Sequence, residues 1–141
     1  MLKTKNYQGV IAIITNDKNE VILGKKIIKP GHFLSDSWHL PGGKINQGED
    51  VKKALEREMK EELSITIKPI KLLCDYPVTI KKMTFLSACY ICQQKDPNDA
   101  LKPADDLQAA QYFPKTEILK IHQKEIMKSW PEELVKYFSN F

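Results

Sequence analysis

Short apolar runs separated by clusters of turn-forming residues fill the first third of the chain. Residues 9–14 (GVIAII) and 21–23 (VIL) are two β-branched runs, and residues 16–19 (NDKN) between them form a turn cluster. This spacing predicts a β-hairpin. Residues 38–40 (WHL) are a candidate for a further brief strand, and the Pro41-Gly42-Gly43 sequence behind them predicts a loop.

The middle of the chain changes to a helical period. Asp50 is a favourable N-cap residue, and residues 51–63 carry apolar side chains at helical spacing, which predicts a helix there. The other predicted elements are strands at 65–67, 72–73, 78–80, 84–92 and 109–113, an exposed loop at 95–106, and helices at 117–128 and 129–138. This order predicts an α/β fold, with a mixed central sheet covered by helices on its faces.

The predicted helix at 51–63 distributes its charges in an uncommon way. On a helical wheel with about 100° per residue and Glu58 at the origin, the apolar arc runs from about −40° to about +100°. The arc is formed by Val51, Ala54, Leu55 and Met59. Glu62 lies at about +40° and Glu61 at about −60°. Glu58 and Glu62 are therefore inside the apolar arc and Glu61 is at its edge, whereas a solvated charge run would lie opposite it.

The acidic residues on this face predict a metal site. Acidic side chains are almost never buried unless they are paired or bind a metal, and three neighbouring carboxylates repel one another without a cation. Clustered hard oxygen ligands select Mg²⁺ or Mn²⁺ over zinc. The glycines before the helix allow close approach of the backbone, so the carbonyl of Gly42 is a further candidate ligand. The alternative is an ordinary exposed helix end neutralised by Arg57 and nearby lysines.

Composition and charge narrow the function classes. The 141 residues are 42% apolar and 28% charged, which suits one domain with a core. The net charge of +4 fits an anionic small ligand and is too small to indicate a nucleic-acid partner, and most of the scattered lysines are expected to solvate the surface. The longest apolar run, residues 10–14, is far too short to cross a bilayer, and the start lacks an apolar signal region. A cytoplasmic protein without a membrane partner is expected.

The chain has three cysteines, Cys74, Cys89 and Cys92, which are too few for a disulfide framework and odd in number. Cys89 and Cys92 have metal-ligand spacing, but they lie in a predicted strand whose period points them to opposite faces. We expect all three to be reduced and mostly buried thiols.

Residues around the predicted helix stand at the spacing of a known family signature: Gly43, Glu49, Arg57, Glu58, Met59, Glu61, Glu62 and Ile65. They resemble the box of the Nudix hydrolases, MutT-like enzymes. Ser64 departs from the pattern, because the family has a glycine there that ends the helix in a left-handed conformation. Residues 38–43 and 106–113 also resemble the family, so the resemblance covers most of the chain.

The resemblance implies a single Nudix domain over residues 1–141, with the box at 43–65. It implies an α/β/α sandwich with a mixed sheet and a loop–helix–loop catalytic motif. Carried over by position, Glu58 and Glu62 would bind Mg²⁺, for which Mn²⁺ can substitute, and Glu61 would be a further ligand or the base that activates water. Arg57 would orient these carboxylates and Glu49 would support them.

Two features of the site stay open at this stage. Glu58 and Glu61 are candidates for the general base, and the resemblance adds a late acidic residue, Asp105 or Asp106, as an alternative. Candidates for substrate binding are Phe33, Trp38 and Gly43.

The resemblance also implies the reaction, attack by water on a diphosphate that links a nucleoside to another group. A (d)NTP pyrophosphohydrolase of MutT type is the preferred hypothesis, and an ADP-ribose or nucleotide-sugar diphosphatase is an alternative. A nucleotide-sensing module without catalysis, and a protein whose acidic helix only contacts a partner, are the non-enzymatic alternatives. The family also allows a homodimer.

Overall fold

The structure of the chain is a computed structural model, and it describes residues 6–27, 37–121 and 130–139. Its elements along the chain are β1 Gly9–Thr15, β2 Glu20–Lys26, β3 Trp38–His39, β4 Gly42–Lys44, α1 Val51–Leu63, β5 Ile67–Ile80, β6 Met83–Gln94, β7 Leu107–Pro114, the 3-10 helix η1 Lys115–Glu117, α2 Ile118–Ile121 and α4 Glu132–Ser139. The predicted hairpin, the brief strand at 38–39, the last strand and the helix at 51–63 are confirmed.

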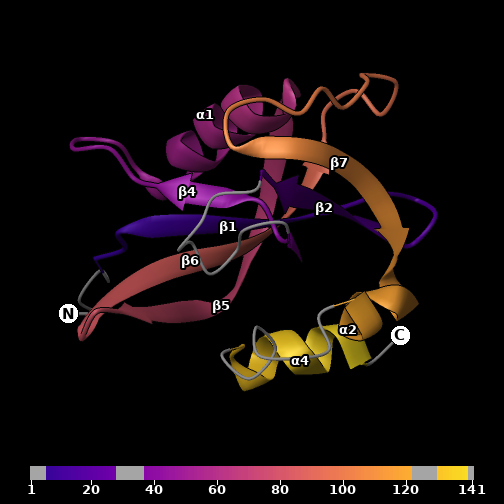
Figure 1. The fold of residues 1–141 in the computed structure, drawn as a ribbon. Helices are drawn as coiled ribbons and strands as arrows, with labels where there is room; N and C mark the ends of the chain where they lie inside the picture. The colour runs from indigo at the N-terminus through magenta and orange to yellow at the C-terminus, as the bar shows by residue number, and fades with distance from the viewer. Residues whose placement is uncertain (1–5, 28–36, 122–129, 140–141) are drawn as a thin grey trace.

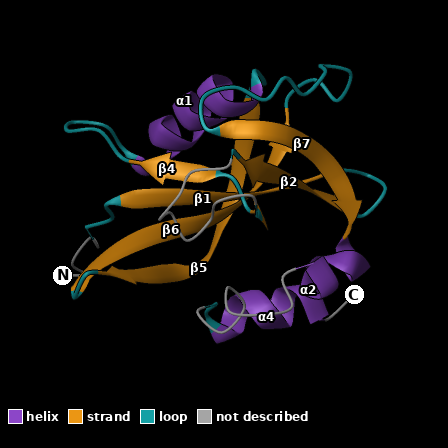
Figure 2. Cartoon of the chain, viewed as in Figure 1, coloured by secondary structure: helices purple, strands orange, loops and turns teal. Residues whose placement is uncertain are grey.

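The sheet is mixed, with β1 at its centre. On one side β1 runs parallel to β6, which pairs antiparallel with β5, so that the strand order ends at β5. On its other side β1 pairs antiparallel with β2 at one end and with β4 at the other. β2 in turn pairs antiparallel with β3 and β7. Figure 1 shows α1 on one face of the sheet and α2 and α4 on the other, and Figure 2 shows the same layers by element type. The predicted α/β class with a mixed sheet is confirmed.

The alternation of side chains along β1 divides the core into two clusters. Val10 and Ala12 belong to the cluster that packs against α1, together with Leu55 and the other buried residues of that helix. Ile13 belongs to the second cluster, which includes Leu134 and the other buried residues of α4. Because a strand with period two is apolar at both sets of positions, β1 is buried on both faces. The run at 9–14 is therefore continuously apolar rather than alternating.

The predicted loop at Pro41-Gly42-Gly43 is wrong for its two glycines. Gly42 and Gly43 lie in β4, where they pair with Ile11 and Val10 of β1. A Cβ atom on Gly42 would overlap the carbonyl oxygen of Val10, so only glycine allows this close approach. The strand results from pairing with a partner more than 30 residues away in the sequence (Ile11 with Gly42), which local turn propensity does not report.

The segments predicted as separate strands from 65 to 80 form one long strand, β5, after Ile65 and Thr66. Its register with β6 shifts between Pro69 and Lys71 and again between Leu72 and Cys74. These bulges change which face the side chains point to, so a strand period of two does not continue through them. Residues 81–82 form the turn between β5 and β6, with positive φ at both residues.

Two further expectations concern the C-terminal part and the membrane. Helix 117–128 is confirmed only as α2, after a 3-10 turn, and its residues 122–129 lie outside the described segments. The short final helix is confirmed as α4. Among the helices of the described segments, none is long and apolar enough to span a bilayer.

Candidate active site

Helix α1 begins and ends with specific backbone contacts. The Asp50 side chain accepts a hydrogen bond from the backbone N–H of Lys53 at 2.8 Å, which is the predicted N-cap. At the other end Ser64 adopts the left-handed conformation, with φ 61° and ψ 30°, and its N–H donates to the carbonyl of Lys60. The residue that departs from the family pattern thus takes the conformation for which glycine is preferred. The helix bounds at 51–63 follow from these two caps.

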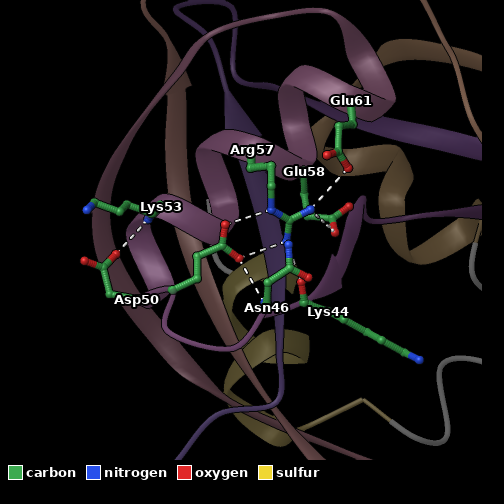
Figure 3. A network of polar contacts seen from close by, with 8 residues as sticks. Lys44, Asn46, Asp50, Lys53, Arg57, Glu58 and Glu61 are labelled. Atoms are coloured by element: carbon green, nitrogen blue, oxygen red, sulfur yellow. Dashed lines mark hydrogen bonds and ion pairs between the residues drawn. The ribbon is translucent and has the colours of Figure 1, made fainter.

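Arg57 connects α1 to the loop before it, as Figure 3 shows. Its Nε and Nη2 donate to the two carboxylate oxygens of Glu49 at 2.8 and 3.0 Å, and Nη2 also donates to the carbonyl of Lys44 at 2.8 Å. Its Nη1 donates to Glu58 at 3.0 Å and to Glu61 at 3.2 Å. These bonds use all five N–H donors of a guanidinium group. Arg57 therefore fixes the positions of carboxylates from both the loop and the helix.

The charges in this network stabilise one another. The bond from Arg57, followed by the backbone N–H of Asn46, holds the pKa of Glu49 below its usual range. The hydrogen bonds that Arg57 donates to Glu49 are also the main cause that raises the pKa of Arg57 further above its already high value. Both groups are therefore ionised throughout the physiological pH range. The fork–fork geometry of Arg57 and Glu49 is the arrangement in which arginine is most specific for a carboxylate.

Glu58 lies directly against Gly43 of β4. A Cβ atom on Gly43 would overlap the carboxyl group of Glu58, so any other residue would displace that carboxylate. The side chain of Glu58 is only 13% exposed. The diglycine thus provides room for an acidic side chain between α1 and the sheet, which gives Gly43 a definite role in the geometry of the site.

Glu62 is the buried acid of the site, with 9% exposure. Burial, and then the neighbouring charge and hydrogen bond of Glu58, raise the pKa of Glu62 to about 9. A carboxylate pair of this kind tolerates a negative charge on both members only when a cation approaches them. The inward placement of Glu58 and Glu62 predicted from the helical wheel is confirmed.

Glu61 is the most exposed of the three acids and shares the Nη1 donor of Arg57 with Glu58. Its side chain is 48% exposed and contacts Arg57, as predicted for a residue at the edge of the apolar arc. Within the described segments, no three His, Cys, Asp or Glu side chains are grouped so that they could hold a metal ion. The site therefore has an inward pair of carboxylates rather than a cluster of three, and the roles of Glu61 and of the Gly42 carbonyl as ligands stay predictions.

The loop at 95–106 reaches the C-terminal end of α1. The backbone N–H groups of Ala104 and Lys102 donate to the carbonyls of Glu62 and Leu63 at 2.8 and 2.9 Å. The Ser64 hydroxyl also donates to the carbonyl of Lys102 at 3.3 Å. The two backbone bonds satisfy the carbonyls of Glu62 and Leu63, which the end of a helix leaves without an intrahelical partner. They also bring the following acidic residues of the loop to the site.

The two late acidic residues differ in their surroundings. Asp105 has a positive φ of 53°, and its charge contributes to the raised pKa of Glu62. Asp106 forms an ion pair with the ammonium group of Lys26 at 3.1 Å. The charge of Asp105 therefore acts on the inward carboxylates.

Lys26 is the residue that the sequence analysis missed. Most lysines are expected to solvate the surface, but the side chain of Lys26 is only 14% exposed and its charge favours the ionised form of Glu62. The signal was present in the alternation of β2. Ile22 packs in the cluster next to α1, and Lys26 stands four residues further along the same strand.

Trp38 is not placed beside the carboxylates. Its ring packs edge-to-face against Phe113 with centroids 4.9 Å apart, next to the cluster that contains α4 rather than the one that contains α1. The ammonium group of Lys25 lies 6.0 Å from its centroid. Phe33 lies outside the described residues, so the roles of Phe33 and Trp38 in substrate binding stay predictions.

Comparisons with known sequences find a family model and several relatives. A family model described as the NUDIX domain matches residues 5–138. The RNA pyrophosphohydrolase of Ruthia magnifica subsp. Calyptogena magnifica is 37% identical over 78 residues, which are 55% of this chain and 40% of that protein. The 8-oxo-dGDP phosphatase NUDT18 of Mus musculus is 33% identical over 64 residues, which are 45% of this chain and 19% of that protein. The matched segments span less than half of these relatives.

Solved structures share the fold over nearly the whole chain. The MutT protein from Methanosarcina mazei Go1 superposes with a TM-score of 0.70 at 22% identity, covering 98% of this chain and 94% of that one. An Ap4A hydrolase from C. elegans gives a TM-score of 0.71 at 19% identity, covering 96% and 100%. At these identities the likeness concerns the arrangement of strands and helices.

Proposed function

This chain belongs to the NUDIX family, and we propose from that premise that it is a divalent-metal-dependent hydrolase of a nucleotide diphosphate bond. The observation that carries the proposal is the inward pair of Glu58 and Glu62 at the end of the Arg57 network. Two hard carboxylates beside a glycine backbone are the donor set that Mg²⁺ uses when it binds substrate phosphates and keeps several waters.

The residues of the chain have separate roles in this proposal. Glu58 and Glu62 would hold Mg²⁺, with Mn²⁺ as a substitute. Arg57 acts as a positioning residue, because it fixes Glu58 to the loop through Glu49. Gly43 leaves the space in which the Glu58 carboxylate lies. The metal, when bound, neutralises phosphate oxygens and lowers the pKa of a bound water.

Two carboxylates are candidates for the general base. Glu61 is exposed and is held by one bond from Arg57, so it is free to reach a water molecule near the helix. Asp105 stands in the loop that is bonded to the end of α1, close enough to influence Glu62. A general base must reach the proton that it abstracts, so the two variants Glu61→Gln and Asp105→Asn distinguish the candidates. The substitution that removes the true base should cause the larger fall in kcat.

The substrate class is the finer part of the proposal. We propose Mg²⁺-dependent pyrophosphohydrolysis of (d)NTPs of MutT type. The curated relatives named above add RNA and 8-oxo-dGDP as substrates to test, and ADP-ribose and nucleotide sugars represent the diphosphatase alternative. The homodimer implied by the family resemblance stays a prediction.

The experiment is a substrate panel with product chromatography in Mg²⁺, in Mn²⁺ and in a chelator. The panel contains the (d)NTPs, 8-oxo-dGDP, ADP-ribose, a nucleotide sugar and an RNA with a 5′-triphosphate. Metal-dependent release of monophosphate with pyrophosphate from (d)NTPs is the expected result. Turnover of none of these substrates, with tight nucleotide binding, would support the sensing module instead. Neither binding nor turnover would support the interaction protein.

A further inference from the structure

Cys74 and Cys89 stand directly opposite each other on the antiparallel strands β5 and β6. All three cysteines are free thiols, and both members of this pair belong to the core cluster that packs against α4. Cα atoms of directly opposite residues lie about 4.5–5.5 Å apart in such sheets, and a disulfide accepts Cα distances of about 4.4–6.8 Å. The pairing of the strands therefore places the two Cα atoms within the range that a disulfide accepts.

The second bulge of β5 places the two thiols on one face. The register shifts between Leu72 and Cys74, so Cys74 points into the same cluster as Cys89. Cys92 lies on the other face of β6, in the cluster next to α1. Cys74 and Cys89 thus form a facing pair, and Cys92, a buried thiol on the same strand as Cys89, does not belong to it.

The two thiols of the pair differ in access and acidity. Cys74 is 8% exposed and Cys89 is fully buried, so an oxidant in solution reaches Cys74 first. The thiol of Cys89 donates to the sulfur of Cys74, which lowers the pKa of Cys74 and raises that of Cys89. Burial, followed by the charges of Glu133 of α4 and the adjacent Asp75, opposes this lowering of the Cys74 pKa and does not cancel it. Cys74 is therefore the attacking thiol and Cys89 the resolving one.

We propose that Cys74 and Cys89 form a dithiol that a hydroperoxide oxidises to an intrachain disulfide, a modification site on the face of the sheet opposite α1. The bond would fix β5, the last strand in the order of the sheet, to its neighbour β6 beneath α4. The site is independent of the proposed hydrolase activity, because neither thiol belongs to the carboxylate network.

The reaction consumes one peroxide for two thiols. The Cys74 thiolate attacks the terminal oxygen of the hydroperoxide and the O–O bond breaks. The leaving oxygen takes a proton and departs as an alcohol, or as water when the oxidant is hydrogen peroxide, which leaves a sulfenic acid on Cys74. The sulfur of Cys89 then attacks the sulfur of Cys74, the S–O bond breaks, and hydroxide leaves with the proton of Cys89 as water. The thiol pair loses two electrons, and the peroxide gains them.

The test treats the full chain with hydrogen peroxide, alkylates the remaining thiols after denaturation, and maps the peptides by mass spectrometry. We expect the oxidised wild type to keep one alkylatable thiol, located at Cys92. Reduction should restore the other two, so that all three become alkylatable. The matched variant Cys92→Ser should keep none. Cys74→Ser and Cys89→Ser should each form no intrachain disulfide, and Cys89→Ser should accumulate higher oxides at Cys74.

Several results would overturn the proposal. These are three alkylatable thiols in wild type at a peroxide concentration that fully oxidises a dithiol standard, a disulfide that includes Cys92, and a disulfide between two chains. Oxidation of Cys74 to a sulfinic acid while Cys89 stays reduced would overturn it as well. Because the wild type and Cys92→Ser decide the outcome, the test does not depend on the folding of the Cys74 and Cys89 variants.

Discussion

The two faces of the sheet are built from the same strands but end in different chemistry. On the face of α4 the core is closed by aromatic side chains, with Trp130 and Phe138 stacked at 5.6 Å. On the face of α1 the apolar cluster ends at Glu58 and Glu62, and the Arg57 network lies beyond them. A helix that only closes a core does not need buried acids, which is why we propose the ligand site on the face of α1 rather than on the face of α4.

The largest expected effect comes from removing one of the inward acids. Glu62→Gln or Glu58→Gln should lower kcat by roughly 10³-fold or more, about 4 kcal/mol, because one of two proposed metal ligands is lost. The melting temperature of Glu62→Gln without metal should not fall, since Glu62 is protonated in the folded chain and glutamine replaces a neutral acid of nearly the same shape. Steady-state kinetics and thermal unfolding measure the two quantities. Glu56→Gln, on the exposed side of the same helix, is the matched control.

A loss of melting temperature in proportion to the loss of activity in these variants would contradict the interpretation. It would mean that the two acids stabilise the fold, as the apolar residues on the opposite face do.

The opposite face should show the reverse behaviour. Leu134 is fully buried in the cluster of α4, so Leu134→Ala should lower the free energy of unfolding by about 2–5 kcal/mol. The kcat per folded molecule should stay within about twofold, because the change is on the other side of the sheet from α1. Denaturant unfolding and kinetics below the unfolding transition measure both. Lys136→Ala, at an exposed position of the same helix, is the control, and a lost kcat in folded Leu134→Ala would show coupling between the two faces.

Arg57→Lys tests whether the network needs geometry or only charge. Lysine keeps the positive charge but replaces a planar five-donor fork with a point charge, so the bidentate contact with Glu49 is lost. We expect kcat/KM to fall by roughly 10–100-fold, as for other residues that orient metal ligands. Lys60→Arg, a charge-conserving change on the exposed side of α1, should have little effect. Equal activity of Arg57→Lys and wild type would show that position 57 supplies only charge.

The elements predicted correctly are those whose sequence signals lie within the element itself. Asp50 as N-cap and the apolar period fixed the limits of α1 at the residues that the structure gives. The inward placement of Glu62 followed from the same period. The two glycines of β4 were missed because their strand exists only through pairing with Val10 and Ile11 of β1.

The composition of the site was less predictable than the helix that carries it. A helical wheel shows that Glu61 is at the edge of the apolar arc, but not that it shares one nitrogen of Arg57 with Glu58. The burial of Lys26 depends on Asp106, which is 80 residues away in the sequence. Such contacts are set by the tertiary arrangement of β2, α1 and the loop at 95–106, which no local period encodes.

The pH dependence of stability distinguishes the two faces without any substrate. The pKa of Glu62 is about 9 in the folded chain and near its ordinary value of 4.5 when unfolded. Between these values the folded state holds a proton that the unfolded state has released. The contribution of Glu62 to the free energy of unfolding therefore falls as the pH rises, by on the order of 1 kcal/mol per pH unit. Denaturant titrations from pH 5 to pH 8 in a chelator should show this slope in wild type and Glu56→Gln, and a flatter one in Glu62→Gln.

The smallest expected effect concerns the end of α1, where two opposing terms meet at Ser64. The positive φ of 61° costs a residue with a side chain about 1 kcal/mol relative to glycine, while the hydroxyl bond to Lys102 recovers part of that cost. Ser64→Gly should therefore change the free energy of unfolding by less than about 1 kcal/mol, whereas Ser64→Ala keeps the strain and loses the bond. We expect stability in the order Gly at or above Ser, and Ser above Ala, measured by denaturant unfolding. If Ser64→Ala were as stable as Ser64→Gly, the left-handed cap would carry no strain, and the hydroxyl bond would not explain why serine serves at this position.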